Sequence, residues 1–175
     1  MANKRIAIVG SRSIANLDVD MSKLPPEGAE WAVAERDWMF YHLDKLVGFD
    51  TVLDYSGRIA ILSGGSVGVD RRAAEYAADN DVPFFLYKPY HLVDNKVEYR
   101  PRYFFTRNAQ IVDNCDMLIA FWDGTSNGTR DTIKLAGKKG KDVVIIKPDR
   151  DAISSFLAPP YFKRFAINSE EVDHE

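Results

Sequence analysis

Short apolar runs, each followed by turn residues, recur five times along the chain. The runs are nearly continuous instead of alternating with polar residues, and they are rich in β-branched or aromatic side chains. Such runs are typical of strands that are buried on both faces, as in a parallel sheet. The predicted strands are Arg5–Val9, Arg58–Leu62, Val82–Tyr87, Met117–Trp122 and Asp142–Ile146.

Apolar residues at helical spacing occupy the segments between these runs. The predicted helices are Glu30–Val47, Val67–Ala78, Tyr103–Cys115 and Gly128–Lys139. Strands that alternate with helices form right-handed βαβ units. The pattern therefore predicts an α/β, Rossmann-like fold, with a doubly wound, mostly parallel sheet of five or slightly more strands and helices on both faces. We expect the first strand beside the fourth, a topological switch point where ligands bind outside the carboxyl ends of the strands.

Two longer segments interrupt this alternation. Residues Ala15–Gly28 and Lys88–Arg102 contain prolines and are predicted to be long loops. Long loops at this end of a sheet act either as lids and specificity elements or as plain connections, and the sequence leaves both open. Beyond Asp149 the chain is interrupted by prolines and ends in the acidic stretch Glu170–Glu175, for which we expect a frayed tail.

Composition narrows the classes of function. The 175 residues suit one domain, and 23 basic against 26 acidic residues give a net charge of −3. That balance argues against a nucleic-acid partner held by general phosphate attraction. Cys115 is the single cysteine and the three histidines lack ligand spacing, so we expect no disulfide, no metal and no cofactor. No apolar run is long enough for a signal peptide core or a membrane span, so we expect a cytoplasmic protein without a membrane partner.

Turn chemistry follows the first predicted strand as Gly10-Ser11-Arg12-Ser13. Gly10 permits a sharp turn and a close ligand, and Ser11 offers a hydroxyl group. Arg12 can bind a phosphate or carboxylate through two N–H groups. These three residues are candidate ligand contacts, and the alternative is a tight turn with a solvated arginine.

The second predicted strand is followed by Ser63-Gly64-Gly65-Ser66-Val67-Gly68-Val69-Asp70. The backbone N–H groups of such a turn and the start of the next helix favour an anion. Close packing between helix and sheet is the alternative explanation for the glycines. Asp70 is a candidate catalytic carboxylate or, alternatively, an ordinary first-turn residue favoured by the helix dipole. The candidate ligand-binding residues of this turn are Ser63, Gly64, Gly65, Ser66 and Gly68.

A third turn, Asp123-Gly124-Thr125-Ser126-Asn127-Gly128-Thr129, joins the fourth strand to a helix. Its glycines and hydroxyl groups have the chemistry of a second anion site, although Ser126 or Thr129 could equally be a helix N-cap without a ligand role. Asp123 could accept hydrogen bonds from a ribose and is the second catalytic candidate. The candidate ligand-binding residues of this turn are Gly124, Ser126, Asn127, Gly128 and Thr129.

Arg107 and Asn108 are polar residues in an otherwise apolar helix. Arg107 points either into the crevice or to the surface, and Asn108 either binds a ligand or is buried with its hydrogen bonds satisfied. If the sheet order is as expected, the turns after strands one, two and four converge on one crevice. Together they predict a pocket for a phosphate-bearing, nucleotide-like small molecule.

The order and spacing of these four motifs resemble the SLOG superfamily, over roughly residues 4–148. That group includes the DNA-processing protein A (Smf) family, the LOG phosphoribohydrolases and small bacterial and phage proteins related to YspA, to which the match is closest. The resemblance implies a Rossmann-like, nucleotide-binding domain over residues 1–150. We expect residues 151–175 to form a C-terminal extension that packs on this domain. Self-association into a homo-oligomer is a further hypothesis from the family.

The LOG enzymes carry Pro-Gly-Gly, any residue, Gly-Thr, two residues and a catalytic Glu. When their Gly-Thr is set on Gly128-Thr129, Thr132 stands at the position of that Glu, and Asp131 lies one residue early. The difference favours a first hypothesis, a protein that binds a nucleotide-like molecule for sensing or sequestering. An N-glycosidic bond hydrolase or deoxyribosyltransferase acting on nucleoside monophosphates is the alternative, with Asp70 and Asp123 as its carboxylates. Single-stranded DNA binding, as in the DNA-processing proteins, is the third hypothesis.

Overall fold

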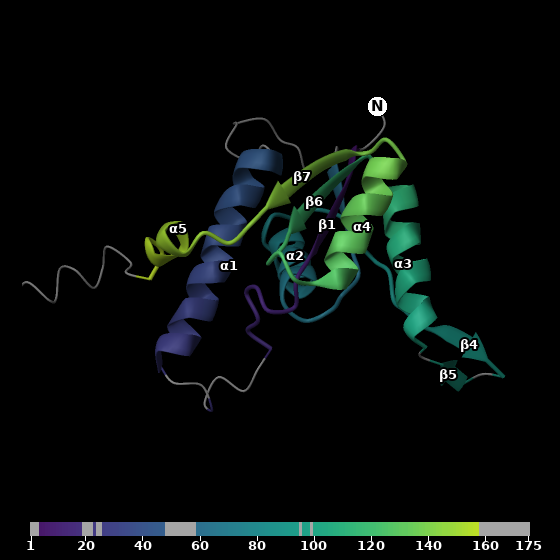
Figure 1. Ribbon diagram of the computed structural model, residues 1–175, viewed down its shortest axis with the longest axis horizontal. Helices are drawn as coiled ribbons and strands as arrows, with labels where there is room; N and C mark the ends of the chain where they lie inside the picture. Colours follow the sequence, from purple (N-terminus) through teal and green to yellow (C-terminus); the bar gives the residue numbers. More distant parts are fainter. Residues whose placement is uncertain are drawn as a thin grey trace, which may run out of the picture.

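A computed structural model describes residues 4–18, 23, 26–47, 59–94, 96–98 and 100–157 (Figure 1). The strands are β1 (Lys4–Gly10), β2 (Ile59–Ser63), β3 (Phe84–Leu86), β4 (His91–Val93), β5 (Lys96–Glu98), β6 (Met117–Phe121) and β7 (Asp142–Ile146). The helices are α1 (Pro26–Val47), α2 (Val69–Asp79), α3 (Pro101–Asn114), α4 (Asn127–Lys138) and α5 (Arg150–Ser154).

The main sheet has five strands in the order β3-β2-β1-β6-β7, and every neighbouring pair is parallel. This confirms the α/β, Rossmann-like fold and the five predicted strands, including the placement of the first beside the fourth. The chain leaves β1 toward β2 and β3 and later returns to the opposite side of β1 through β6. The carboxyl ends of β1 and β6 therefore flank the switch point of the sheet.

Alternating side chains of the buried strands divide the core into two layers. Ile6 and Ile8 of β1 pack with residues of α1, α2 and α5, whereas Ala7 and Val9 pack with residues of α3 and α4. Figure 1 shows α1 and α5 on one side of the sheet and α3 and α4 on the other. Helices on both faces explain why the strands are continuously apolar.

One predicted loop contains regular structure that the sequence analysis missed. Within Lys88–Arg102, β4 and β5 pair as a short antiparallel hairpin, with Leu92 opposite Val97. Each strand has only three residues, which is too short for a periodic pattern to appear. The other predicted loop, Ala15–Gly28, also ends early, because α1 begins at Pro26; residues 19–22, 24 and 25 lie outside the described residues.

The C-terminal part of the described chain forms α5, which lies against α1. Asp149 begins this helix by accepting hydrogen bonds from the N–H groups of Asp151 and Ala152, at 2.9 and 3.0 Å. The acidic tail predicted at Glu170–Glu175 falls outside the described residues. Among the helices that are described, none combines the length and apolar character needed to cross a membrane.

Candidate functional site

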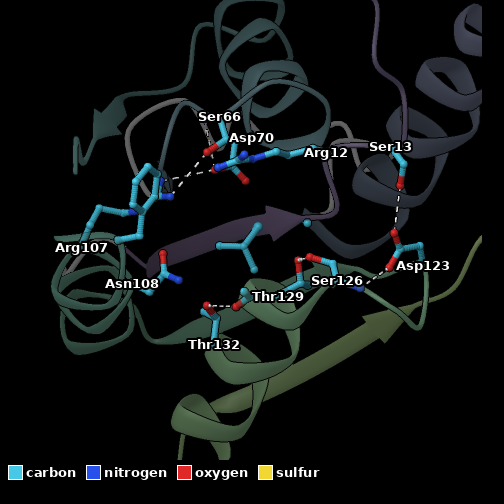
Figure 2. Close-up of a pocket in the computed structure, with 14 residues that line it drawn as sticks. Arg12, Ser13, Ser66, Asp70, Arg107, Asn108, Asp123, Ser126, Thr129 and Thr132 are labelled. Atoms are coloured by element: carbon cyan, nitrogen blue, oxygen red, sulfur yellow. Dashed lines mark hydrogen bonds and ion pairs between the residues drawn. The ribbon is translucent and has the colours of Figure 1, made fainter. Parts of the chain in front are cut away.

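A cavity of about 460 Å³ opens beside the carboxyl end of β1, at the switch point of the sheet. The loop after β1, the starts of α2 and α4, and α3 contribute its walls. Figure 2 shows the side chains of Arg12, Asp70 and Arg107 along one side, facing Thr129 and other residues of α4. The lining residues are Val9, Gly10, Arg12, Ser13, Ser66, Asp70, Phe104, Arg107, Asn108, Asp123, Ser126, Gly128, Thr129 and Thr132.

The structure brings ten of the residues singled out in the sequence to this cavity. They are Gly10, Arg12, Ser66, Asp70, Arg107, Asn108, Asp123, Ser126, Gly128 and Thr129. Seven others do not line it: Ser11, Ser63, Gly64, Gly65, Gly68, Gly124 and Asn127.

Two of these seven are buried serines that connect the segments around the cavity through hydrogen bonds to the backbone. Ser63 is fully buried at the end of β2, where its hydroxyl donates to the carbonyl of Ile8 at 2.7 Å. Ser11 is equally buried, and its hydroxyl oxygen accepts the N–H of Asp123 at 3.1 Å. Both hydroxyl groups therefore hold neighbouring segments of the carboxyl edge together.

The missing side chain of Gly64 makes room for Arg107 of α3. A Cβ atom built at Gly64 would lie 1.1 Å from Nη1 of Arg107 and 2.8 Å from Oδ2 of Asp70. Gly68 has a positive φ of 76°, and a Cβ there would meet the carbonyl oxygens of Arg12 and Ile14 at 2.7 and 2.8 Å. Protein packing alone is enough to require both glycines.

Arg107 and Asp70 form a buried ion pair over Gly64. Nη1 of Arg107 lies 3.5 Å from Oδ2 of Asp70, and Nη2 lies 3.5 Å from the hydroxyl of Ser66. These contacts are long, and Nε of Arg107 is buried without a hydrogen-bond partner in the described part of the chain. The guanidinium group thus lines the crevice with at least one N–H donor that has no partner in the described part of the chain.

Burial shifts the proton equilibria of both partners in this pair. Burial raises the pKa of Asp70 above its ordinary value, although Arg107, the N–H groups of Ser66 and Gly10, and Arg12 act in the opposite direction. Burial likewise lowers the pKa of Arg107, against the attraction of Asp70. A buried carboxyl with a raised pKa is a common feature of functional sites.

Asp123 has the opposite electrostatic character. Its Oδ1 accepts the N–H groups of Thr125 and Ser126 at 2.9 and 2.8 Å, and its Oδ2 accepts the hydroxyl of Ser13 at 2.9 Å. Desolvation opposes the charge of Asp123, but these hydrogen bonds and one from Ser11 outweigh it and hold the pKa well below the ordinary value. Asp123 therefore stays ionised and orders the loop before α4.

The first turn of α4 presents polar groups to the cavity. The hydroxyl oxygens of Ser126 and Thr129 lie 3.1 Å apart, and the hydroxyl of Thr132 donates to the carbonyl of Gly128 at 2.8 Å. Ser126 is the residue before the helix, but its side chain makes no capping hydrogen bond. The first N–H groups of α4 have no acceptor within the helix, and Gly128 and Thr129 of this turn line the cavity.

Carboxylates of the chain also lie at the start of α2, as Asp123 does before α4. Oδ2 of Asp18 accepts the N–H of Gly68, and Oδ2 of Asp70 accepts the N–H of Ser66, each at 3.4 Å. Asp18 also pairs with Arg71 at 2.7 Å and with the buried Arg72 at 3.2 Å. The chain therefore supplies its own anions where the sequence pattern suggested an external one.

Arg12 and Phe104 complete the wall opposite α4. Arg12 is exposed, and its guanidinium carbon lies 5.8 Å from the centroid of the Phe104 ring. The guanidinium carbon of Arg107 lies 5.9 Å from the same centroid. Two cations thus flank one aromatic ring at the cavity wall.

Four residues of the cavity were missed as site residues: Val9, Ser13, Phe104 and Thr132. Ser13 follows Arg12 directly, and Phe104 lies three residues before Arg107, on the same face of a helix, so their position relative to these arginines was the available signal. Thr132 was noted only as a substitute for Glu, yet one helical turn separates it from Gly128 and brings it to the same cavity. Asn108 lines the cavity, and its side chain makes no hydrogen bond to any residue that the structure describes.

Comparisons with known proteins find solved structures that share the fold of this chain. No family model matches the sequence, and no curated protein gives a significant match. DNA processing protein A from Streptococcus pneumoniae, a solved structure, aligns at a TM-score of 0.55 and 17% identity, over 95% of this chain and 56% of that chain. The chain shares its fold with DNA processing protein A. It spans little more than half the length of that relative.

Two further solved structures show the same arrangement. DNA processing protein A from Helicobacter pylori, described as having a unique single-stranded DNA binding mode, aligns at a TM-score of 0.53 and 18% identity, over 99% of this chain and 83% of that chain. The molybdenum cofactor binding protein from Rippkaea orientalis aligns at 0.50 and 18%, over 97% and 98%. These likenesses agree with the α/β, Rossmann-like fold described above. At such identities they establish the fold alone.

Proposed function

We propose that the cavity binds a nucleotide or nucleotide-derived small molecule, for sensing or sequestering, with its phosphate at the start of α4. The observation that carries the proposal is the first turn of α4, where Gly128 and Thr129 line the cavity together with the hydroxyl groups of Ser126 and Thr129. Helix N-termini favour anions through their free N–H groups and dipole.

The charges around the cavity support an anionic ligand. Arg12 forms no ion pair with any carboxylate of the described chain, and it lines the cavity with Arg107. Asp70 is paired with Arg107, and the carboxylate of Asp123 is held by hydrogen bonds from its own loop. A phosphate would therefore meet the guanidinium groups of Arg12 and Arg107 and a helix start, in a cavity that Asp70 and Asp123 also line.

Calorimetric titration with AMP, ribose 5-phosphate and adenosine tests this function. We expect AMP and ribose 5-phosphate to bind, and Arg12→Ala to weaken both by about tenfold or more, because a charge-assisted hydrogen bond contributes about 1.5–3 kcal/mol. Arg130→Ala is the matched control, since Arg130 is an exposed arginine of α4 that does not line the cavity. Absence of binding by every phosphate-bearing titrant, or an unchanged affinity in Arg12→Ala, would refute the proposal.

Hydrolysis of the N-glycosidic bond of a nucleoside monophosphate is a second candidate, favoured by Asp70. This buried carboxyl lines the cavity with a raised pKa, whereas the lowered pKa of Asp123 makes that residue a poor proton donor. Water would replace the base at the sugar carbon and release free base and ribose 5-phosphate. Chromatography of nucleoside monophosphates incubated with the protein tests it. Free base must appear with the wild type and be lost in Asp70→Asn.

Single-stranded DNA binding is the remaining candidate, because a hollow between α3 and α4 adjoins the cavity at Asn108 and Thr132 and is lined by Lys134 and Lys138. A strand crossing both hollows would meet these cations. Fluorescence anisotropy of a labelled single-stranded oligonucleotide at moderate salt distinguishes DNA binding from the binding of a small ligand. Binding that falls steeply with salt and is weakened in Lys134→Ala/Lys138→Ala would favour DNA.

A further inference from the structure

A second cavity, of about 520 Å³, adjoins the first on the side of the sheet edge formed by β3. Ser66 and Phe104 line both cavities, so the two hollows meet at these residues. Gly64 and Gly65, which the sequence motifs assigned to ligand binding, line this second cavity and not the first. The predicted glycine turn therefore belongs to the same crevice as the other motifs, but to its other half.

The walls of this half are mainly apolar. Phe84 and Leu86 of β3, Pro89 and Phe104 line it, and the Leu86 side chain is 47% exposed to solvent. Phe84 and Leu86 alternate with Phe85, which does not line the cavity, so one face of the edge strand is turned toward the hollow. Exposed apolar side chains around a concave surface are typical of ligand contact.

The glycine turn that lines the second cavity has backbone N–H groups without a partner among the described residues. No acceptor among the residues that the structure describes takes the N–H of Gly64 or Gly65. A planar ring with polar edges fits such a site, because its faces can contact Phe104 and Leu86 while its edge pairs with the turn. The phosphate half and the apolar half then lie on opposite sides of Phe104, whose ring the two arginines flank from the first cavity.

We propose that the second cavity binds the base of the same ligand whose phosphate lies at the start of α4. This inference rests on the proposed function and adds to it the position and chemistry of the base site. It assigns Leu86 and Phe104 as the base contacts and the Gly64–Gly65 turn as the partner of the base edge. A nucleotide would span the two cavities past Phe104, with its sugar at Ser66.

Leu86→Asn tests the base site, with Phe85→Asn as the matched control on the opposite face of β3. Affinities for the four common nucleoside monophosphates and for ribose 5-phosphate are measured by calorimetry. We expect Leu86→Asn to weaken the binding of at least one nucleoside monophosphate about fivefold or more, because the base loses the apolar contact with the leucine side chain. Ribose 5-phosphate should bind with unchanged affinity. Phe85→Asn should change none of these values.

Ala74→Leu provides a second test from the helix side, because Ala74 of α2 is half-buried and lines the second cavity. Its control is Ala78→Leu, at an exposed position one helical turn further along α2. The larger side chain should also weaken the binding of the nucleotide and leave the affinity for ribose 5-phosphate unchanged. If both cavity variants keep the wild-type ratio of nucleotide to ribose 5-phosphate affinity, the base site is refuted while phosphate binding stands. If ribose 5-phosphate and all four nucleotides fail to bind the wild type, the proposed function fails and the inference with it.

Discussion

Gly64 shows how a residue with no side chain can determine the position of a functional group. Its Cα lies beneath the guanidinium of Arg107, so the α3 arginine reaches the start of α2 and pairs with Asp70. The pair connects helices that pack on opposite faces of the sheet. The glycine thus permits a contact that no residue with a Cβ atom would allow.

Replacing Gly64 by alanine should therefore destabilise the protein. The added Cβ would overlap the guanidinium of Arg107, which is 6% exposed, and would push it away from Asp70. We expect the free energy of unfolding in urea to fall by about 1–3 kcal/mol, the cost of overpacking a core. Gly137→Ala is the control, because nothing lies within 4 Å of its Cβ position in α4, and it should raise stability by about 0.5–1 kcal/mol. Equal stability of Gly64→Ala and wild type would contradict the packing argument.

Asp123 should give the loop before α4 a dependence on pH. Its pKa is lowered in the folded state, so the stability that it contributes is present above the ordinary Asp pKa and is lost as pH falls toward the folded value. Asp123→Ala should cost about 0.5–2 kcal/mol near pH 7, as for loss of a helix-start acceptor.

Urea unfolding of wild type and Asp123→Ala at pH 7 and in acid checks this sign. The difference between the two proteins should shrink as the solution is acidified. Asp131→Ala serves as reference, since Asp131 makes only a surface pair with Arg130 among the residues described. A difference that grows in acid would show that Asp123 is not held ionised by its hydrogen bonds.

At the level of elements, carboxylates of the chain lie before both helices that start at the carboxyl edge. Asp18 accepts the N–H of Gly68 before α2 and also pairs with Arg71 and Arg72, while Asp123 accepts the N–H of Ser126 before α4. The glycine-rich sequence before α2 was predicted to be an anion site, because sequence patterns do not show which carboxylates will fold onto a helix start. Asp18 lies 50 residues away from Gly68 in the chain.

Asp18→Ala tests whether this contact secures the loop after β1. Loss of the carboxylate leaves the N–H of Gly68 without its acceptor and weakens the pairing of the buried Arg72. We expect a loss of about 1–3 kcal/mol in urea unfolding, the cost of an unsatisfied buried group. Asp37→Ala, which removes only a partly exposed pair with Arg36, should cost less than about 1 kcal/mol. A similar effect of both substitutions would mean that Asp18 is an ordinary surface residue.

For the whole molecule, the fold could be predicted from the sequence because the signals that set it are local and repeated. Continuous apolar runs identified every strand of the main sheet, and the alternation with helices gave its parallel order. The boundaries were less accurate where a short edge strand or a proline start was involved, as in β3 and α3. The three-residue strands of the hairpin carried too little pattern to be found.

The candidate site could be predicted only in part. Residues next to strand ends, such as Arg12 and Ser126, were found because parallel strands bring their carboxyl ends to one edge. The contacts of Asp18 and the division of the crevice by Phe104 could not be found in this way. Both depend on how helices separated in sequence pack across the sheet, which periodicity does not encode.

The switch point between β1 and β6 has one more consequence. The hollow exists because the chain leaves β1 in one direction and comes back on its other side, and no core side chain has to be removed to create it. Exposed or half-buried positions such as Arg12, Ser13 and Asn108 can therefore be exchanged at small cost to the framework. Proteins with this strand order can therefore keep the same cavity while substitutions at its walls change the ligand that it binds.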